Sequence, residues 1–257
     1  MREILESIAC KVSNDIVSLP ESFERGKEIC IGADGTPTCK IDKVAEDAIL
    51  QFIEERDLPF NILSEEIGYL DRGYEKTLVI DPVDGTHNAI LGIPFYSVSL
   101  AIGTSSLSDI EFGLVRNIVT GQTYYAERGK GAVLDGKKIS TKSFDRTRST
   151  FLVYMGMYSH PDTLIVARKS VKTRSLGCAS LEMCMVADGR VDAYYMNCEV
   201  REKSIRVFDI AASALILREA GGDVVTLSGE PLDMPFDLSA RSNFLAFGDR
   251  AVKEVII

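Results

Sequence analysis

The segment Thr77-Leu-Val-Ile-Asp-Pro-Val-Asp-Gly-Thr86 decides how the rest of the chain is interpreted. Its apolar start predicts a buried strand, and two carboxylates, Asp81 and Asp84, follow that strand directly. Pro82 and Gly85 favour a turn there, so the two carboxylates need not point to opposite faces as they would in a continuing strand. An ordinary surface turn would use the same residue types, and this alternative stays open for the segment taken alone.

A second pair of carboxylates has the same setting. The segment Asn61-Ile-Leu-Ser-Glu-Glu66 places Glu65 and Glu66 just after another short apolar strand. Clustered carboxylates repel one another and have raised pKa values when no counter-ion is present. A site of three or more oxygen ligands, without histidine or cysteine, suits Mg²⁺ or Mn²⁺. We therefore expect a magnesium site, with manganese as a possible substitute, where the two strands end.

Composition narrows the class of protein. The chain has 257 residues, 46% hydrophobic and 26% charged, which is typical of a globular protein. Its net charge of −9 argues against general binding of nucleic acid, which depends on Lys and Arg. Residues 87–108 lack charged side chains, but the alternation within 95–102 predicts a buried strand and no membrane span. Six cysteines without a C-x-x-C pair, and no signal peptide, predict a cytoplasmic protein.

Apolar periodicity divides the chain into two predicted lobes. Helical spacing marks residues 2–18 and 41–53, and a run of short strands follows over 95–139. Beyond a polar stretch, strands and helices alternate, which favours an α/β arrangement. We expect an N-terminal α+β lobe over residues 1–140, carrying most metal ligands, and a C-terminal α/β lobe over 141–257.

Four motifs in order resemble those of the inositol monophosphatase and fructose-1,6-bisphosphatase superfamily. Asp81-Pro-Val-Asp-Gly-Thr86 is similar to its D-P-[IV]-D-G-T signature, and Ser64-Glu-Glu66 to its acidic pair. Thr38-Cys-Lys-Ile-Asp42 resembles its T-x-x-D element, and Val207-Phe-Asp-Ile-Ala-Ala212 its W-D-x-A-A-G signature, with Phe in place of Trp. The final Gly of that signature is Ser213 here. Gly32-Ala-Asp-Gly-Thr-Pro37 is most similar to the archaeal branch that acts on both fructose-1,6-bisphosphate and inositol-1-phosphate.

The resemblance implies a fold, an activity and a set of site residues. The fold would be a layered α-β-α-β-α sandwich with the active site between the lobes. The enzyme would be a magnesium-dependent phosphomonoesterase with two or three metal ions in each site. The implied metal ligands are Glu65, Asp81, the Val83 carbonyl, Asp84 and Asp209. Asp209 taken alone is equally consistent with a helix N-cap, and only its motif suggests a ligand.

The resemblance also assigns catalytic and substrate-binding residues. Asp42 and Thr86 would hold and deprotonate the attacking, metal-activated water, with support from Glu66. Asp34, in a mobile loop, would assist a third magnesium ion. Substrate contacts are expected from the following residues: Asp84, Gly85, Thr86, Gly177, Cys178, Ala179, Arg174, Arg201 and Lys203. The three cations suit a second phosphate, although solvated surface charge is an equal alternative for each of them.

The sequence leaves two other functions open. One is a 3′-phosphoadenosine-5′-phosphate or NADP phosphatase of the same superfamily. The other, from a different class, is a non-catalytic sugar-phosphate-binding module, whose hallmark would be the loss of Asp42, Thr86 or a metal carboxylate, and none is lost here. In either case the partner would be a small phosphate ester, and a homodimer is expected because dimers are frequent in the family.

Overall fold

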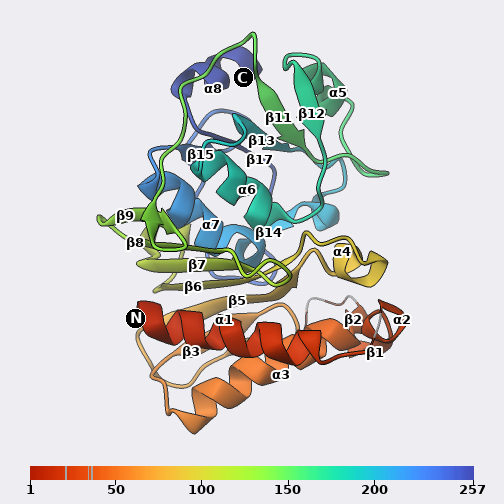
Figure 1. The fold of residues 1–257 in the computed structure, drawn as a ribbon, viewed down its shortest axis with the longest axis vertical. Helices are drawn as coiled ribbons and strands as arrows, with labels where there is room; N and C mark the ends of the chain where they lie inside the picture. Colours follow the sequence, from red (N-terminus) through yellow and green to blue (C-terminus); the bar gives the residue numbers. More distant parts are fainter. Residues whose placement is uncertain (21, 34, 36) are drawn as a thin grey trace.

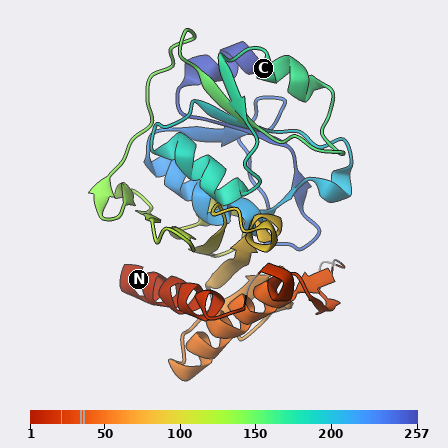
Figure 2. The ribbon, with the colours of Figure 1, turned by 45° about the vertical axis from the view of Figure 1, so that its right-hand side comes forward.

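The computed structural model describes residues 1–20, 22–33, 35 and 37–257, and it arranges them in five layers (Figure 1). Two long helices form one outer layer, followed by a large sheet, two central helices, a smaller sheet and two short outer helices. The layers stay distinct when the molecule is turned (Figure 2). The expected α-β-α-β-α sandwich is therefore confirmed.

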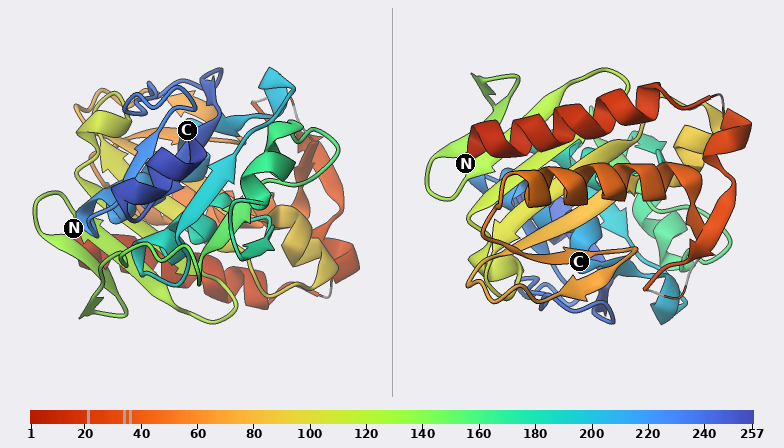
Figure 3. Two further views of the ribbon diagram at one scale, coloured as in Figure 1. Left: turned by 90° about the horizontal axis from the view of Figure 1, so that it is seen from above. Right: turned by 90° about the horizontal axis from the view of Figure 1, so that it is seen from below.

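The first outer layer consists of α1 (Arg2–Val17) and α3 (Lys40–Glu55), which lie side by side over one face of the large sheet (Figure 3, right). Leu5, Ile8 and Val12 are fully buried along one stripe of α1, as their spacing predicts. Burial of such a side chain contributes about 1.5–3 kcal/mol relative to leaving it exposed. This packing fixes α3, and with it the carboxylate at its start.

The large sheet has eight strands in the order β10-β9-β8-β7-β6-β5-β3-β4. The pair β3 and β5 is parallel, and the other neighbours are antiparallel. The strands are β3 (Asn61–Ser64), β4 (Gly68–Leu70), β5 (Thr77–Asp84), β6 (Ser97–Gly103), β7 (Phe112–Asn117), β8 (Thr123–Glu127), β9 (Gly131–Leu134) and β10 (Lys137–Lys138). Because β3 and β5 are parallel neighbours, their acidic carboxyl ends meet at one edge of the sheet.

The central layer consists of α6 (Ala179–Ala187) and α7 (Val207–Glu219), which pack against each other between the two sheets. Residues 207–217 are all buried, so α7 is not amphipathic, as expected for a helix enclosed on every side. Gly113 of β7 permits its close approach, because a Cβ there would lie 2.8 Å from the Ala212 carbonyl oxygen. The start of α7 is thereby fixed relative to the large sheet.

The smaller sheet has five strands in the order β12-β11-β13-β17-β15, with α5 (Asp162–Ala167) and α8 (Arg250–Ile256) on its outer face (Figure 3, left). Its strands are β11 (Thr150–Val153), β12 (Lys172–Arg174), β13 (Ala193–Met196), β15 (Asp223–Val225) and β17 (Phe244–Phe247). Phe151 and Leu245 are fully buried in the apolar core beneath α8. The chain passes from the large sheet to the smaller one between β10 and β11.

Short elements lie beside these layers. They are β1 (Glu28–Ile31) paired with β2 (Pro37–Cys39), β14 (Ile205–Arg206) paired with β16 (Arg241–Ser242), α2 (Ser22–Arg25), α4 (Thr86–Leu91) and the 3₁₀ turns η1 (Leu107–Asp109) and η2 (Arg201–Lys203). Within the described part of the chain, no helix is both long and apolar enough to cross a bilayer.

Candidate active site

A β-bulge places two carboxylates at the end of β5. Asp81 pairs with Ser99 of β6 and Asp84 pairs with Ser97, so three residue steps on β5 oppose two steps on β6. Because side chains alternate along a strand, the extra residue allows both carboxylates to face the same side. The turn predicted between Asp81 and Asp84 is wrong, since the strand continues through Asp84 and the bulge takes the place of the turn.

Three carboxylates from separate elements meet beside this bulge. One oxygen each of Glu65, Asp81 and Asp209 lies within 4.8 Å of the others. Burial, followed by the neighbouring carboxylates, raises the pKa of Asp81 well above its usual range. Burial likewise raises the pKa of Glu65 to about 8. We call these three residues the acidic group.

The chemistry of the acidic group fits a hard divalent cation. Its donors are oxygen atoms only, which suits Mg²⁺ or Mn²⁺ better than zinc. Within the described part of the chain, the Oδ1 atom of Asp81 is buried and has no hydrogen-bond partner. A bound cation would give that oxygen a partner and would offset the repulsion among the carboxylates.

Asp209 serves the helix and the acidic group together. It is the third residue of α7, and its Oδ2 accepts a hydrogen bond of 2.8 Å from the backbone N–H of Arg206. The N-cap role considered for Asp209 alone is wrong, because Arg206 is the N-cap residue; Asp209 stabilises the helix start from the third helical position by accepting that N–H. The helix begins at Val207, and this places the Asp209 carboxylate beside Glu65 and Asp81.

Arg206 is a cation that the motifs did not single out. Its Nη2 donates to Asp209 Oδ1 at 3.2 Å, and its Nη1 donates to Glu65. The guanidinium carbon lies 4.6 Å from the centroid of the Phe208 ring. Arg206 directly precedes the Val207–Ala212 motif, but its residue type gives no signal of a contact with Glu65.

Asp84 faces a second helix start. Its Oδ2 accepts hydrogen bonds of 2.6 Å from both the backbone N–H and the hydroxyl of Ser180, and its Oδ1 accepts one of 3.2 Å from the Ala179 N–H. The buried thiol of Cys178 donates to the same carboxylate at 3.2 Å. Burial raises the pKa of Asp84 to about 6, although the Ser180 hydrogen bonds oppose that change.

Asp42 and Thr86 form a pair at the start of α3. The Thr86 hydroxyl lies 2.8 Å from Asp42 Oδ1 and 2.9 Å from the Val83 carbonyl oxygen. Its single proton serves one of these acceptors at a time. The other carboxylate oxygen of Asp42 accepts the backbone N–H of Cys39 at 3.3 Å, as Asp209 accepts that of Arg206. Burial raises the pKa of Asp42 to about 7, so it can exchange a proton near neutral pH.

Buried hydrogen bonds support the segment that carries Glu65 and Glu66. The carboxylate of Glu66 accepts a hydrogen bond from the Thr38 hydroxyl. Behind it, Glu46 Oε1 accepts the Ser64 hydroxyl at 2.6 Å and the Ile67 N–H at 3.0 Å. Glu46 is fully buried, so this anchor holds both ends of the segment from within the core.

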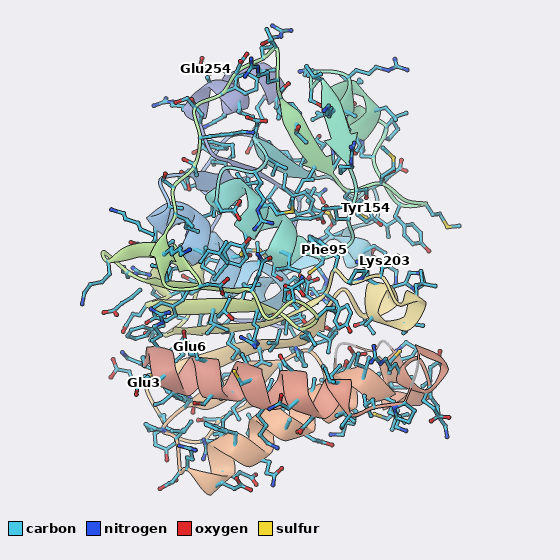
Figure 4. The ribbon with its side chains drawn as sticks, viewed as in Figure 1. Glu3, Glu6, Phe95, Tyr154, Lys203 and Glu254 are labelled. Atoms are coloured by element: carbon cyan, nitrogen blue, oxygen red, sulfur yellow. The ribbon has the colours of Figure 1, made fainter. Side chains whose placement is uncertain are left out.

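A cavity of about 1070 Å³ opens beside the acidic group. Glu65 and Asp209 line it together with Arg206. Three further cations line it as well, and we call them the cationic group: Arg201, Lys203 and Arg241. Tyr154, Tyr194 and Leu238 supply apolar surface. Figure 4 labels Tyr154 and Lys203, which lie toward the side of the molecule where α4 projects.

The other predicted substrate residues divide into two sets. Gly177, Cys178 and Ala179 line the cavity, as does Glu182, a buried carboxylate that the motifs did not include. Arg174 is exposed and is not among the residues described as lining the cavity; its Nη1 donates to the neighbouring Thr173 carbonyl oxygen at 2.7 Å. Gly85, with a φ of 87°, precedes α4, as its turn role required. Asp34 lies outside the described residues.

Comparisons with known proteins agree with this geometry. The model of the inositol monophosphatase family matches residues 8–257. A fructose-1,6-bisphosphatase/inositol-1-monophosphatase from Methanothermobacter thermautotrophicus is 37% identical, with 97% of this chain and 92% of that protein covered. A bifunctional NADP phosphatase/NAD kinase from Methanococcus maripaludis is 35% identical, and the match spans all of this chain but 48% of that protein.

Solved structures extend the similarity to the fold. The crystal structure of an inositol monophosphatase–fructose 1,6-bisphosphatase has a TM-score of 0.87 and 31% identity, and the match covers 99% of this chain and 97% of that one. The family model, the similar sequences and the layered fold all span nearly the whole chain, and the acidic group takes one carboxylate from each of three family motifs. The chain belongs to the inositol monophosphatase family.

Proposed function

We propose that this phosphoric monoester hydrolase is magnesium-dependent and hydrolyses fructose-1,6-bisphosphate and inositol-1-phosphate. The observation that carries the proposal is the buried, oxygen-only acidic group in a cavity that also contains cations. A phosphate ester brings several negative charges, and such a cavity offers positive charge for phosphate as well as carboxylates for a metal. The relatives named for both activities support the same substrates.

The carboxylates at the two strand ends would hold the metal. Glu65, Asp81 and the Val83 carbonyl would form the tighter site, and Asp81, Asp84 and Asp209 the second, with Asp34 near a third. Mg²⁺, or Mn²⁺ in its place, would supply Lewis acidity and would make water more acidic. Asp84 accepts hydrogen bonds from the backbone N–H and the hydroxyl of Ser180, so its carboxylate is held in position before any ligand binds.

Asp42 and Thr86 are proposed to act on the attacking water. The Thr86 hydroxyl lies between Asp42 and the Val83 carbonyl, so it can accept a hydrogen bond from water while it donates to Asp42. Asp42, with a pKa near neutrality, can then take up the proton. Glu66 would support this arrangement from its contact with Thr38.

Substrate binding is assigned to three sets of residues, one near the reacting phosphate, one near the sugar or inositol hydroxyls and one near a second phosphate. Gly85 and Thr86 at the start of α4 would place backbone N–H groups near the reacting phosphate. Gly177, Cys178 and Ala179, at the start of α6, would contact the sugar or inositol hydroxyls. Arg201 and Lys203 would contact a second phosphate, because both line the cavity. Arg174 is the weaker candidate, since it is exposed and does not line the described cavity.

NADP phosphatase activity is the second candidate. The cavity is large for a sugar bisphosphate, and Tyr154 and Tyr194 offer aromatic surface for a base. A relative named as an NADP phosphatase matches the whole of this chain. A 3′-phosphoadenosine-5′-phosphate phosphatase would use the same features.

A phosphate-release screen tests these assignments. The purified protein is assayed with Mg²⁺ on four substrates: fructose-1,6-bisphosphate, inositol-1-phosphate, NADP and 3′-phosphoadenosine-5′-phosphate. We expect the highest kcat/KM on the first two. Preference for either nucleotide would favour the second candidate. Binding without phosphate release from any of them would point to a non-catalytic binding module.

We also propose a cytoplasmic homodimer. All six cysteines are free thiols, which supports a reducing compartment. Met157, Leu164 and Ile165 are exposed apolar side chains near α5 and support a contact between copies. Light scattering of the purified protein would give its oligomeric state.

A further inference from the structure

Arg206 holds two of the three carboxylates of the acidic group. Its backbone N–H and its Nη2 both donate to Asp209, at 2.8 and 3.2 Å, and its Nε lies 3.4 Å from Asp209 Oδ2. Its Nη1 donates to Glu65. Both oxygens of Asp209 and one oxygen of Glu65 are thus engaged by a single guanidinium.

A divalent cation bound by the acidic group would need the same negative charge. Glu65 and Asp209 are two of the three residues whose oxygens lie close enough to share an ion. A guanidinium and a metal ion repel each other at this range, and the repulsion is strong where water is largely excluded. The side chain of Arg206 is 20% exposed, so it borders the cavity and is not enclosed by the core.

We propose that Arg206 is an internal counter-ion that competes with the metal for Glu65 and Asp209. Without metal, it keeps both carboxylates paired and in position. When metal binds, the guanidinium leaves these oxygens and turns into the cavity, where it can pair with a phosphate group. The inference rests on the metal site of the proposed function.

Metal and phosphate should then favour each other's binding. A phosphate in the cavity draws the guanidinium away from the carboxylates and thereby frees them for metal. By linkage, metal must strengthen phosphate binding by the same factor. Part of this cooperativity comes from direct attraction between the two ions, and only the remainder depends on Arg206.

Calorimetric titration of the full chain with Mg²⁺ and with Mn²⁺ tests the proposal. The proteins are wild type, the neutral variants Arg206→Met and Arg206→Gln, and Arg206→Lys, which keeps the charge. Arg146→Met is the matched control, because it removes the same charge from the exposed segment before β11, away from the acidic group and the residues that line the cavity. Each titration is repeated with inorganic phosphate, and melting without metal verifies that each variant folds.

We expect the neutral variants to bind metal at least about fivefold more tightly than wild type, while Arg206→Lys and Arg146→Met stay within about twofold. Phosphate should tighten metal binding less in the neutral variants than in wild type. Unchanged or weaker metal binding in both neutral variants would overturn the proposal and would make Arg206 a support for the bound metal. Absence of metal binding in every protein, wild type included, would instead reject the metal site itself.

Discussion

The acidic group and the cationic group line one cavity but are built differently. Asp81 and Asp209 are 2% and 7% exposed and project from a central strand and a central helix. Arg201 and Lys203 are exposed and belong to a single 3₁₀ turn outside the layers. The carboxylates are held by the core, whereas those two cations lie on a surface turn.

We infer from this difference that the acidic group determines the reaction and that the cations of η2 determine which substrates are preferred. Moving Asp81 or Asp209 would require moving β5 or α7, and both elements are buried between other layers. Changing the cations of η2 requires no change in the core. We therefore expect substitutions in the acidic region to affect every substrate, and substitutions in η2 to affect only substrates that reach it.

Metal removal should give the largest effect. Dialysis against EDTA is expected to abolish phosphate release from all substrates, because Arg206 can pair with the carboxylates but cannot make water more acidic as a metal ion does. Addition of Mg²⁺ should restore it. Full turnover in metal-free buffer would contradict the role of the acidic group.

Substitution of Thr86 should come next. Thr86→Val keeps the shape but removes the hydroxyl between Asp42 and the Val83 carbonyl, so kcat should fall about 100-fold on every substrate. Saturating Mg²⁺ in the assay separates this loss from weaker metal binding. Thr226→Val, in the half-buried turn directly after β15, is the matched control and should be active. A loss of less than threefold would remove Thr86 from the proposed proton transfer.

Asp209→Asn tests whether Asp209 does more than stabilise the start of its helix. The amide oxygen can still accept the Arg206 N–H, so the melting temperature should change little. Loss of the charge should lower kcat at least about tenfold, equivalent to about 1.4 kcal/mol. A sharp drop in stability with unchanged activity per folded molecule would make Asp209 purely structural.

Arg201→Ala tests the selectivity of η2. It should lower kcat/KM for fructose-1,6-bisphosphate about tenfold, because a charge-assisted contact to the second phosphate is lost. Inositol-1-phosphate has no second phosphate and should change by less than about twofold. Arg146→Ala, on the exposed segment before β11, controls for net charge. Equal losses on both substrates would contradict the separation between the two groups.

The pH dependence of stability should give the smallest effect. Burial raises the pKa of Glu65 to about 8, of Asp42 to about 7 and of Asp84 to about 6, while unfolded carboxylates titrate near about 4. Between these limits the folded state binds more protons, so stability falls as pH rises. We expect the melting temperature of metal-free protein to drop by a few degrees from pH 5 to pH 9. Saturating Mg²⁺ should flatten this slope, and an identical slope with and without Mg²⁺ would contradict the metal site.

Apolar runs and helical periodicity correctly predicted the strands and helices whose formation depends on residues adjacent in the sequence. The apolar run before Asp81 and the periodicity of α1 and α3 gave strands and helices where the structure has them. The bulge in β5 was missed, because it depends on register against β6, which no single segment encodes. The weakly apolar strands β12 and β15 were missed because the rest of their sheet stabilises them.

Contacts between residues that are far apart in the sequence could not be predicted from the sequence either. Arg206 and Glu65 are 141 positions apart, and nothing in either segment signals their contact. Glu182 was missed for a similar reason: inside the apolar run of α6 its charge gave no indication that its Oε1 accepts the Leu176 N–H at 2.9 Å. Family motifs identified the carboxylates of the site, but which cations and apolar side chains line its cavity depends on the tertiary fold.

The aspartates in the first turns of α3 and α7 affect how the site assembles during folding. In each, one oxygen of an aspartate closes the first helical turn, at Cys39 or Arg206, while the other oxygen faces the site. The first turn of either helix therefore cannot fray without displacing Asp42 or Asp209. Each of these two carboxylates acquires its orientation when its helix forms, before any substrate or ion arrives. A bound ion would in turn slow amide hydrogen exchange at Cys39 and Arg206, so that two backbone protons would report on the occupancy of the site.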